Sequence, residues 1–182
     1  IGDQFRVAPS FYFANGKDFL YYVATGDSLW GKSPIYQRRN ITDVNIFGAT
    51  IQSSLQLNAF LSLFLNYNFN HSEIGSFEEN PQLEDKKLKF TPMHQLKTGI
   101  DWSNKWFDWH LAAIYKSKQY TTDDNSRYID PYMTFDTKIS HSMGEKLLFF
   151  ASITDLLDNQ HLDSEFYLSP GRTVTLGISY KF

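Results

Sequence analysis

Apolar residues occupy every second position in the last segment of the chain, TVTLGISYKF, which runs from Thr173 to Phe182. The polar or small residues of that segment fill the positions between them. Successive side chains of a β-strand point to opposite faces of a sheet, so a period of two predicts a strand with one apolar face. The apolar residues are Val174, Leu176, Ile178, Tyr180 and Phe182.

Most of the chain follows the same pattern, and no segment keeps a helical period. With the terminal segment, these stretches predict about nine strands and an all-β fold. The other eight segments, in chain order, are FRVAPSFYF, FLYYVAT, IFGATIQSSLQL, LSLFLNYNFN, QLKTGIDW, FDWHLAAIYK, YMTFDTKIS and KLLFFASIT.

The predicted connections alternate in length. Short turns are expected at NGKD (residues 15–18), near Asn58, at SNK (103–105) and at HSMG (141–144), and Asn-Gly is a strong hairpin signal. Long polar stretches cover residues 25–34, 71–91, 117–131 and 155–172. Tight turns at one end and long loops at the other are typical of an outer-membrane β-barrel.

Composition agrees with a barrel and excludes several other classes. A net charge of −3 gives no electrostatic reason to bind nucleic acid, and the absence of cysteine excludes thiolate chemistry. No apolar run approaches the roughly 18 residues of a membrane helix. Trp102, Trp106 and Trp109 flank one short turn, as expected for an interfacial aromatic girdle. A soluble β-sandwich, with these rings in its core, is the alternative.

Strand parity adds one expectation. Single-chain bacterial barrels have an even number of strands, and an open sheet in lipid would leave backbone groups unsatisfied. Nine strands would place Ile1 on the extracellular side and Phe182 on the periplasmic side. We therefore expect residues 1–182 to be the C-terminal part of a barrel, completed by another chain or by further sequence.

Over nearly its whole length the chain resembles the C-terminal portion of TonB-dependent outer-membrane receptors. The segments that carry the resemblance are YQRRNITDVNIFGATIQ, LFLNYNFNHS, TPMHQLKTGIDW, YKSKQY, YMTFDTKIS, ITDLLDNQH and SPGRTVTLGISYKF. Three residues depart from the family pattern: Asp155 and Leu157 stand where the family often has Asn and Phe, and His161 where it often has Tyr.

The resemblance implies a 22-stranded transmembrane antiparallel barrel closed by an N-terminal plug that lies outside these residues. It implies uptake of a ferric siderophore, haem or cobalamin, with the TonB complex acting through the plug. Other implied partners are the remaining barrel strands, outer-membrane lipid and a surface lipoprotein. The final strand, with Tyr180 and Phe182, resembles the signal read by the barrel-assembly machinery. No cofactor is expected, and a passive pore or structural barrel is the alternative function.

Chemistry in the sequence points to binding rather than catalysis. It contains no GxSxG, HExxH or glycine-rich phosphate loop. Oxygen ligands in TTDDNS (Asp123, Asp124 and Asn125) are weak candidates for Ca²⁺, because EF-hand spacing is missing. EDKKLK (residues 84–89) is interpreted as a solvated run of charges. Aromatic and histidine side chains of the long loops are the candidates for ligand contact: Trp30, Tyr36, His71, Phe77, Tyr120, Tyr128, His161, Phe166 and Tyr167.

Overall fold

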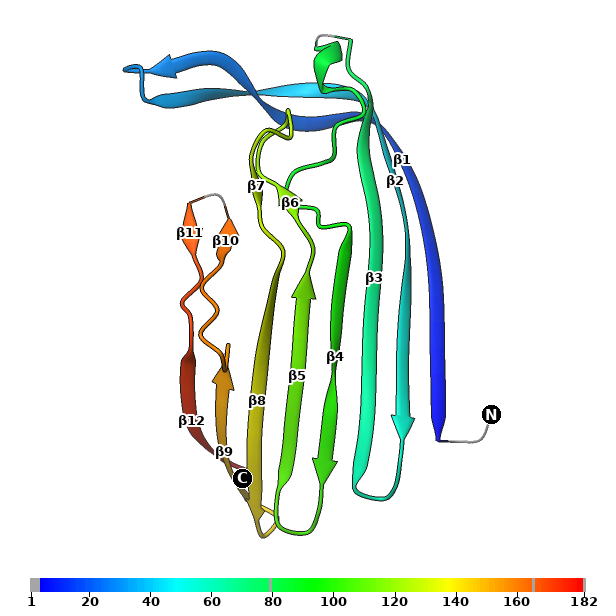
Figure 1. Ribbon diagram of the computed structural model, residues 1–182, viewed down its shortest axis with the longest axis vertical. Coiled ribbons are helices and arrows are strands. Elements are labelled where there is room, and N and C mark those ends of the chain that lie inside the picture. The colour runs from blue at the N-terminus through cyan, green and yellow to red at the C-terminus, as the bar shows by residue number, and fades with distance from the viewer. Residues whose placement is uncertain (1–3, 79, 165, 182) are drawn as a thin grey trace.

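The computed structural model describes residues 4–78, 80–164 and 166–181, and nearly all of the ordered elements are strands. The main sheet has eight antiparallel strands in the order β1-β2-β3-β4-β5-β8-β9-β12 within the described residues (Figure 1). Its strands are β1 (Phe5–Leu29), β2 (Ser33–Gln56), β3 (Leu61–Ser76), β4 (His94–Ser103), β5 (Asp108–Lys116), β8 (Tyr132–Met143), β9 (Leu147–Thr154) and β12 (Thr173–Tyr180).

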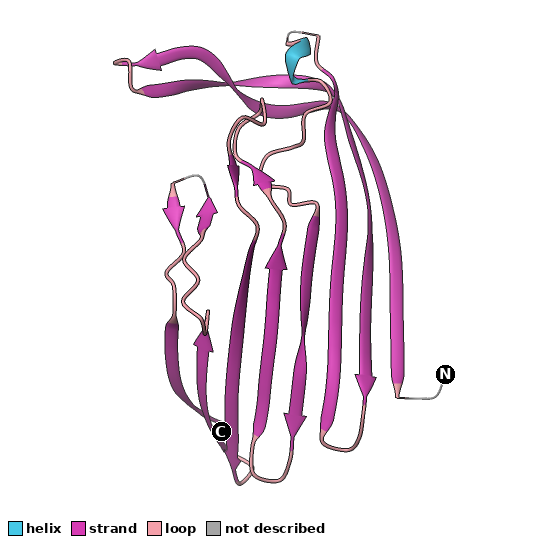
Figure 2. Cartoon of the chain, viewed as in Figure 1, coloured by secondary structure: helices cyan, strands magenta, loops and turns pink. Residues whose placement is uncertain are grey.

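Smaller elements lie in the loops at the upper end of the sheet (Figure 2). A one-turn 3₁₀ helix, η1 (Pro81–Leu83), follows β3. Two small hairpins are formed by β6 (Gln119–Tyr120) with β7 (Tyr128–Ile129), and by β10 (Leu162–Ser164) with β11 (Tyr167–Leu168). No helix among the described residues is long and apolar enough to cross a membrane.

The prediction of a hairpin at residues 15–18 is wrong. Residues 5–29 form one continuous strand, in which Asn15 pairs with Asn45 and Gly16 with Val44. The Asn15 side chain donates to Asn45 Oδ1 at 2.7 Å. Because β2 extends unbroken alongside, continuing the ladder satisfies backbone groups that a turn would leave unpaired.

The smaller number of strands also changes where the two ends of the chain are expected to lie. The sheet has eight strands rather than nine, and the true turn of the first hairpin lies between Leu29 and Ser33. Both ends of the described chain therefore lie at the end of the sheet that carries the short turns (Figure 1). The expected extracellular position of Ile1 falls outside the described residues.

Cross-strand register assigns two faces to the sheet, because paired residues share a face. Leu176 pairs with Ala151 on one face, and Thr175 pairs with Ser152 on the other. Val174, Leu176 and Ile178 are each more than 60% exposed, so no second layer covers the apolar side of β12 within the described chain. This single layer contradicts a soluble sandwich, in which those side chains would be buried.

The three tryptophans of the predicted girdle lie together at the short-turn end of the sheet. Trp102 pairs with Trp109 across β4 and β5, on the same face as Leu111 and Ile100. Trp106 lies in the turn and is 64% exposed. These rings flank the apolar band where interfacial aromatics are stabilised.

On the polar face, aromatic rings lie over glycines of the neighbouring strand. The Tyr12 ring lies over Gly48, and its hydroxyl donates to Asn70 Oδ1 at 2.9 Å. Phe150 covers Gly177 in the same way on β9 and β12. A Cβ at either glycine would collide with the ring, so glycine is required for this close approach.

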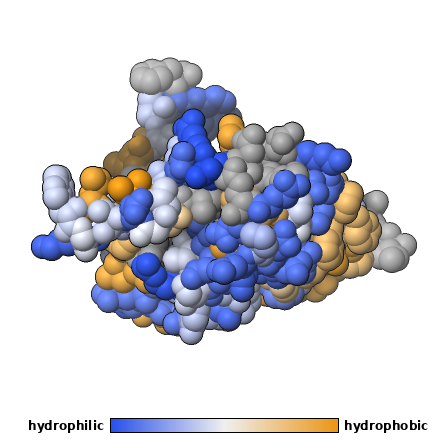
Figure 3. Space-filling view, turned by 90° about the horizontal axis from the view of Figure 1, so that it is seen from above, coloured by the Kyte–Doolittle hydropathy of each residue, from blue (hydrophilic) through white to orange (hydrophobic). Residues whose placement is uncertain are grey.

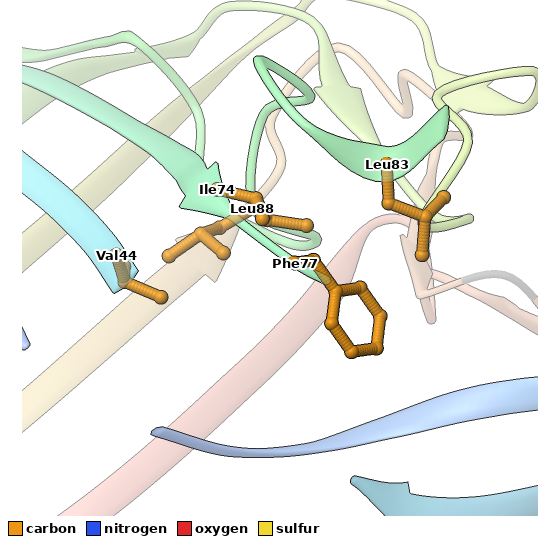
Figure 4. Close-up of a cluster of buried hydrophobic side chains, with 5 residues drawn as sticks. All are labelled: Val44, Ile74, Phe77, Leu83 and Leu88. Carbon is orange, nitrogen blue, oxygen red and sulfur yellow. The ribbon is translucent and has the colours of Figure 1, made fainter. Parts of the chain in front are cut away.

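A small hydrophobic cluster forms at the upper end of β2 and β3 (Figure 4). Leu83 of η1 and Leu88 fold back onto the strands and cover Phe77, which is 2% exposed. The cluster consists of Val44, Ile74, Phe77, Leu83 and Leu88. It gives the loop between β3 and β4 its own core and fixes that loop above the sheet.

Candidate ligand-binding site

The first hairpin continues beyond the main sheet as a two-stranded arm. Pairing of β2 with β3 ends at Asp43 and Ser76, with a register shift at that point. Pairing of β1 with β2 continues to Leu29 and Ser33. Figure 1 shows this segment, residues 17–43, turning away from the strand direction and running across the top of the sheet. We call it the hairpin arm.

Two other loops join beside the arm into one body, residues 80–91 and 121–127, which we call the loop platform. The Asn125 side chain accepts a hydrogen bond from the Lys87 backbone N–H at 2.8 Å and donates to the Lys87 carbonyl at 2.9 Å. The Phe90 N–H donates to the Tyr120 carbonyl at 2.8 Å. These paired bonds fix the two loops to each other.

Within the platform, Asp124 closes the turn of the second loop. The backbone N–H of Ser126 donates to Asp124 Oδ1 at 3.0 Å, and the Ser126 hydroxyl donates at 2.8 Å. Hydrogen bonds from the Ser126 backbone, then from the Thr122 and Ser126 hydroxyls, lower the pKa of the Asp124 carboxyl to about 2. The carboxylate therefore stays ionised and holds the turn.

The arm and the platform enclose a cavity of about 590 Å³. Seen from above, much of the described surface is hydrophilic (Figure 3). Three basic and two acidic side chains line the cavity, together with one tyrosine ring and several amide and hydroxyl groups. The charged residues and the tyrosine are Lys86, Lys89, Arg127, Asp123, Asp124 and Tyr36.

Lys89 lies where the arm and the two platform loops meet. Its ammonium is 2.8 Å from Asp123 Oδ1 and donates to the Tyr22 carbonyl of the arm at 3.3 Å. It also lies 5.8 Å from the centroid of the Tyr36 ring, within cation–π range. An aromatic ring beside several cationic side chains is suited to binding an anionic or planar ligand.

Of the predicted ligand contacts, Tyr36 lines this cavity and Trp30 does not. Trp30 lies at the tip of the arm, 93% exposed, with a positive φ of 50°. Tyr120 and Tyr128 pair across β6 and β7, and the Lys118 ammonium lies over both rings, at 5.1 and 4.8 Å. Tyr128 keeps half of its surface exposed.

Phe77 is buried, and its ring packs in the core of the loop between β3 and β4. His71 is engaged in an ion-pair cluster, with Nε2 2.9 Å from Glu73 Oε2 and 2.8 Å from the Lys87 ammonium. Its ring stacks on Phe47 at 4.6 Å.

The last loop carries the remaining aromatic candidates away from the cavity. His161 stacks on Tyr132 at 3.8 Å and lies 3.3 Å from Asp163 Oδ1. Phe166 and Tyr167 are 80% and 73% exposed at the β10–β11 hairpin. The structure therefore separates the predicted set into several places rather than one site.

The three weak calcium candidates make contacts within the loop platform. Asp123 pairs with Lys89, Asp124 accepts from Ser126, and Asn125 is committed to the Lys87 backbone. No group of three or more acidic or histidine side chains in the described ranges is arranged to hold a metal ion. All three residues instead stabilise the platform.

Sequence reasoning missed the basic residues of the cavity. Lys86 and Lys89 belong to the run interpreted as solvated charges, yet the Lys89 side chain is only 16% exposed. Only the nearby hairpin arm distinguishes Lys86 and Lys89 from an ordinary run of charged surface residues. Of the two terminal aromatics, Tyr180 ends β12 and is half exposed, and Phe182 lies outside the described residues.

Comparison with known proteins shows which family and which solved structures this chain resembles. The family model described as "TonB dependent receptor-like, beta-barrel" matches residues 2–156. The ferric citrate transporter FecA matches with a TM-score of 0.82 at 15% identity, over 99% of this chain and 29% of that one. The copper transporter OprC matches with a TM-score of 0.82 at 15% identity, over 100% and 30%. FyuA, the ferric yersiniabactin uptake receptor from Yersinia pestis, matches with a TM-score of 0.72 at 12% identity, over 100% and 28%.

The fold is thus that of the C-terminal strands of an outer-membrane receptor barrel. The chain belongs to the TonB-dependent receptor-like β-barrel family. It spans less than a third of the length of the solved structures that it matches. These relatives are receptors and transporters rather than enzymes.

Proposed function

We propose that this chain forms the C-terminal strands and extracellular loops of a receptor that imports a scarce nutrient across the bacterial outer membrane. The observation that carries the proposal is the outer cavity, built from three loops above a sheet with one apolar and one polar face. In this arrangement the short turns lie in the periplasm, the apolar face contacts lipid and the polar face lines the barrel interior.

The energy-coupled mechanism depends on parts outside these residues. The main sheet has two unpaired edges, on β1 and β12, in the described chain. Unsatisfied edges in hydrocarbon cost several kcal/mol per group. We propose that further barrel strands pair with both edges, and that a plug in the interior transmits the pull of TonB.

We propose an anionic iron chelate as the ligand class, with haem and cobalamin as the competing classes. Lys86 and Arg127 supply positive charge around the cavity, where Lys89 is paired with Asp123, and Tyr36 supplies a flat apolar surface. Charge-assisted hydrogen bonds favour carboxylate or catecholate groups at such a site. FecA and FyuA, both similar in fold, are described as handling ferric citrate and ferric yersiniabactin.

The test is uptake by cells that carry the complete receptor. Cells with and without TonB are given radiolabelled ferric citrate, a ferric catecholate, haem and cyanocobalamin. Saturable uptake of a ferric chelate that requires TonB supports the proposal, and saturable uptake of haem or cyanocobalamin alone reassigns the ligand class. A Tyr36→Ala, Lys86→Ala variant is expected to bind the transported chelate about tenfold more weakly, because two side chains that contact the ligand are lost.

A passive pore is the alternative that this experiment separates. Solutes crossing in proportion to their concentration, at the same rate without TonB, would contradict the receptor. Polar contacts on the inner face, such as that between Asp101 and His110 at 2.6 Å, suit a hydrated interior in either case.

A further inference from the structure

The hairpin arm has little of its own to hold it in place. Beyond Asp43, β2 loses its partner β3 and pairs only with β1. An isolated two-stranded hairpin is marginally stable in water. The ladder is also interrupted by a register shift between Ala24 and Ser28. Within the described chain, contacts to the neighbouring loops therefore hold the arm in place.

Lys89 makes such contacts from a fixed position. The Thr91 hydroxyl donates to the Lys89 carbonyl at 2.9 Å, and the next residue, Phe90, is bonded to Tyr120. Two residues earlier, Lys87 is clamped on both sides by the Asn125 amide. The backbone of Lys89 thus belongs to the loop platform, and only its side chain reaches the arm.

The Lys89 ammonium is held by a carboxylate that is itself nearly buried. The Asp123 side chain is 9% exposed and that of Lys89 is 16% exposed. Removing one partner of such a pair leaves the other charge poorly solvated, so the pair resists separation. Held in this way, the ammonium donates to the Tyr22 carbonyl and faces the Tyr36 ring, one contact to each strand of the arm.

We propose that Lys89 is a positioning residue that fastens the hairpin arm to the loop platform and thereby builds the outer cavity. Asp123 keeps the ammonium directed at the arm. The wall formed by Ala24, Pro34 and Tyr36 then stands opposite the wall formed by the platform. This assignment concerns the arm's position and does not depend on which ligand the receptor takes up.

The experiment measures the distance between the arm and the platform side of the molecule in the complete receptor, in lipid nanodiscs. Spin labels are attached to cysteines at Ser33 and Asp130, two exposed residues in a segment that has no native cysteine. Pulsed electron paramagnetic resonance gives the distance distribution. The matched variants are Lys89→Met, Lys89→Arg, Asp123→Asn and, as control, Lys86→Met, which removes the same charge from the same cavity.

A narrow distribution is expected for the unmodified receptor, Lys89→Arg and Lys86→Met. Lys89→Met should at least double the width, and Asp123→Asn should widen it to a lesser degree. Hydrogen exchange of residues 81–91 should stay the same in all variants, which shows that the platform is intact. An unchanged width in Lys89→Met, equal widening in Lys86→Met, or loss of protection in residues 81–91 would each overturn the assignment. Because no ligand is used, this outcome is separate from that of the uptake experiment.

Discussion

Single residues set the two faces of the sheet, and Leu176 provides the sharpest test. It lies mid-strand on the exposed apolar face, whereas its neighbour Thr175 faces the opposite side with Ser152. We expect Leu176→Arg to destabilise the assembled barrel by about 2–4 kcal/mol and Thr175→Arg to cost much less, because only the first charge enters hydrocarbon. Urea titrations of the complete receptor refolded into bilayers measure both costs. Equal costs would contradict the assignment of faces.

The contact between Tyr12 and Gly48 makes a second prediction at the residue scale. A methyl group at Gly48 would meet the Phe69 backbone oxygen and the Tyr12 phenol, and would displace the phenol from Asn70. Gly48→Ala should therefore destabilise the receptor by about 1–3 kcal/mol, the usual cost of overpacking. In a Tyr12→Ala background the same change should cost less. A double-mutant cycle in the same urea titrations detects this coupling, and strict additivity would argue against the contact.

At the scale of elements, the loop platform should be sensitive to acid through Asp124. The folded-state pKa of its carboxyl is lowered from 3.8 to about 2. A lowered pKa stabilises the folded loop above the unfolded pKa, and that contribution is lost as pH falls from about 3.8 to about 2. Hydrogen exchange of residues 121–127 in the complete receptor should therefore accelerate in this window, after correction for intrinsic rates.

Asp124→Asn is the control for that measurement. The amide oxygen still accepts from Ser126 but does not titrate, so the acid-dependent loss of protection should disappear. If the unmodified loop and this variant respond alike to acid, another group governs the loop.

At the scale of the whole molecule, the unpaired edges of β1 and β12 predict whether residues 1–182 can insert into a bilayer without further strands. One face of the sheet is apolar, but an open eight-stranded sheet leaves two rows of backbone groups without partners in the described chain. A polypeptide of residues 1–182 alone should not insert into bilayers as a monomeric barrel. Electrophoresis without heating, which separates closed barrels from unfolded chains, is the measurement. A compact, heat-modifiable monomer would show that the edges can close on each other.

Much of the fold could be predicted because the responsible interactions are local. A strand's period of two fixes which side chains share a face, as for Leu147 and Phe149 on the outer side of β9, and register carries that assignment to its neighbours. The turns near Asn58 and after Ser103 were predicted for the same reason, since each connects strands that are adjacent in sequence. The turn predicted at residues 141–144 lies at residues 144–146 instead, because β8 extends to Met143. The position of the tryptophan girdle followed from those turns.

Other features depend on partners that are distant in the sequence. Asn-Gly at residues 15 and 16 has the composition of a turn, yet the ladder with β2 keeps it extended. Phe77 is buried because it packs in one cluster with Leu83 and Leu88, which the local sequence pattern does not show. Lys89 and Tyr22 are 67 positions apart, and no local pattern relates them.

By itself, then, the sequence determined the membrane-barrel class, the two faces of its strands and the aromatic band at the short-turn end. The alternation of apolar and polar residues contains that information, because each strand meets hydrocarbon on one side and polar surroundings on the other. Tertiary structure alone decided the number of strands, the course of the hairpin arm and the composition of the outer cavity. Those depend on which backbone groups and charges meet across long sequence separations, where a buried partner outweighs local preference.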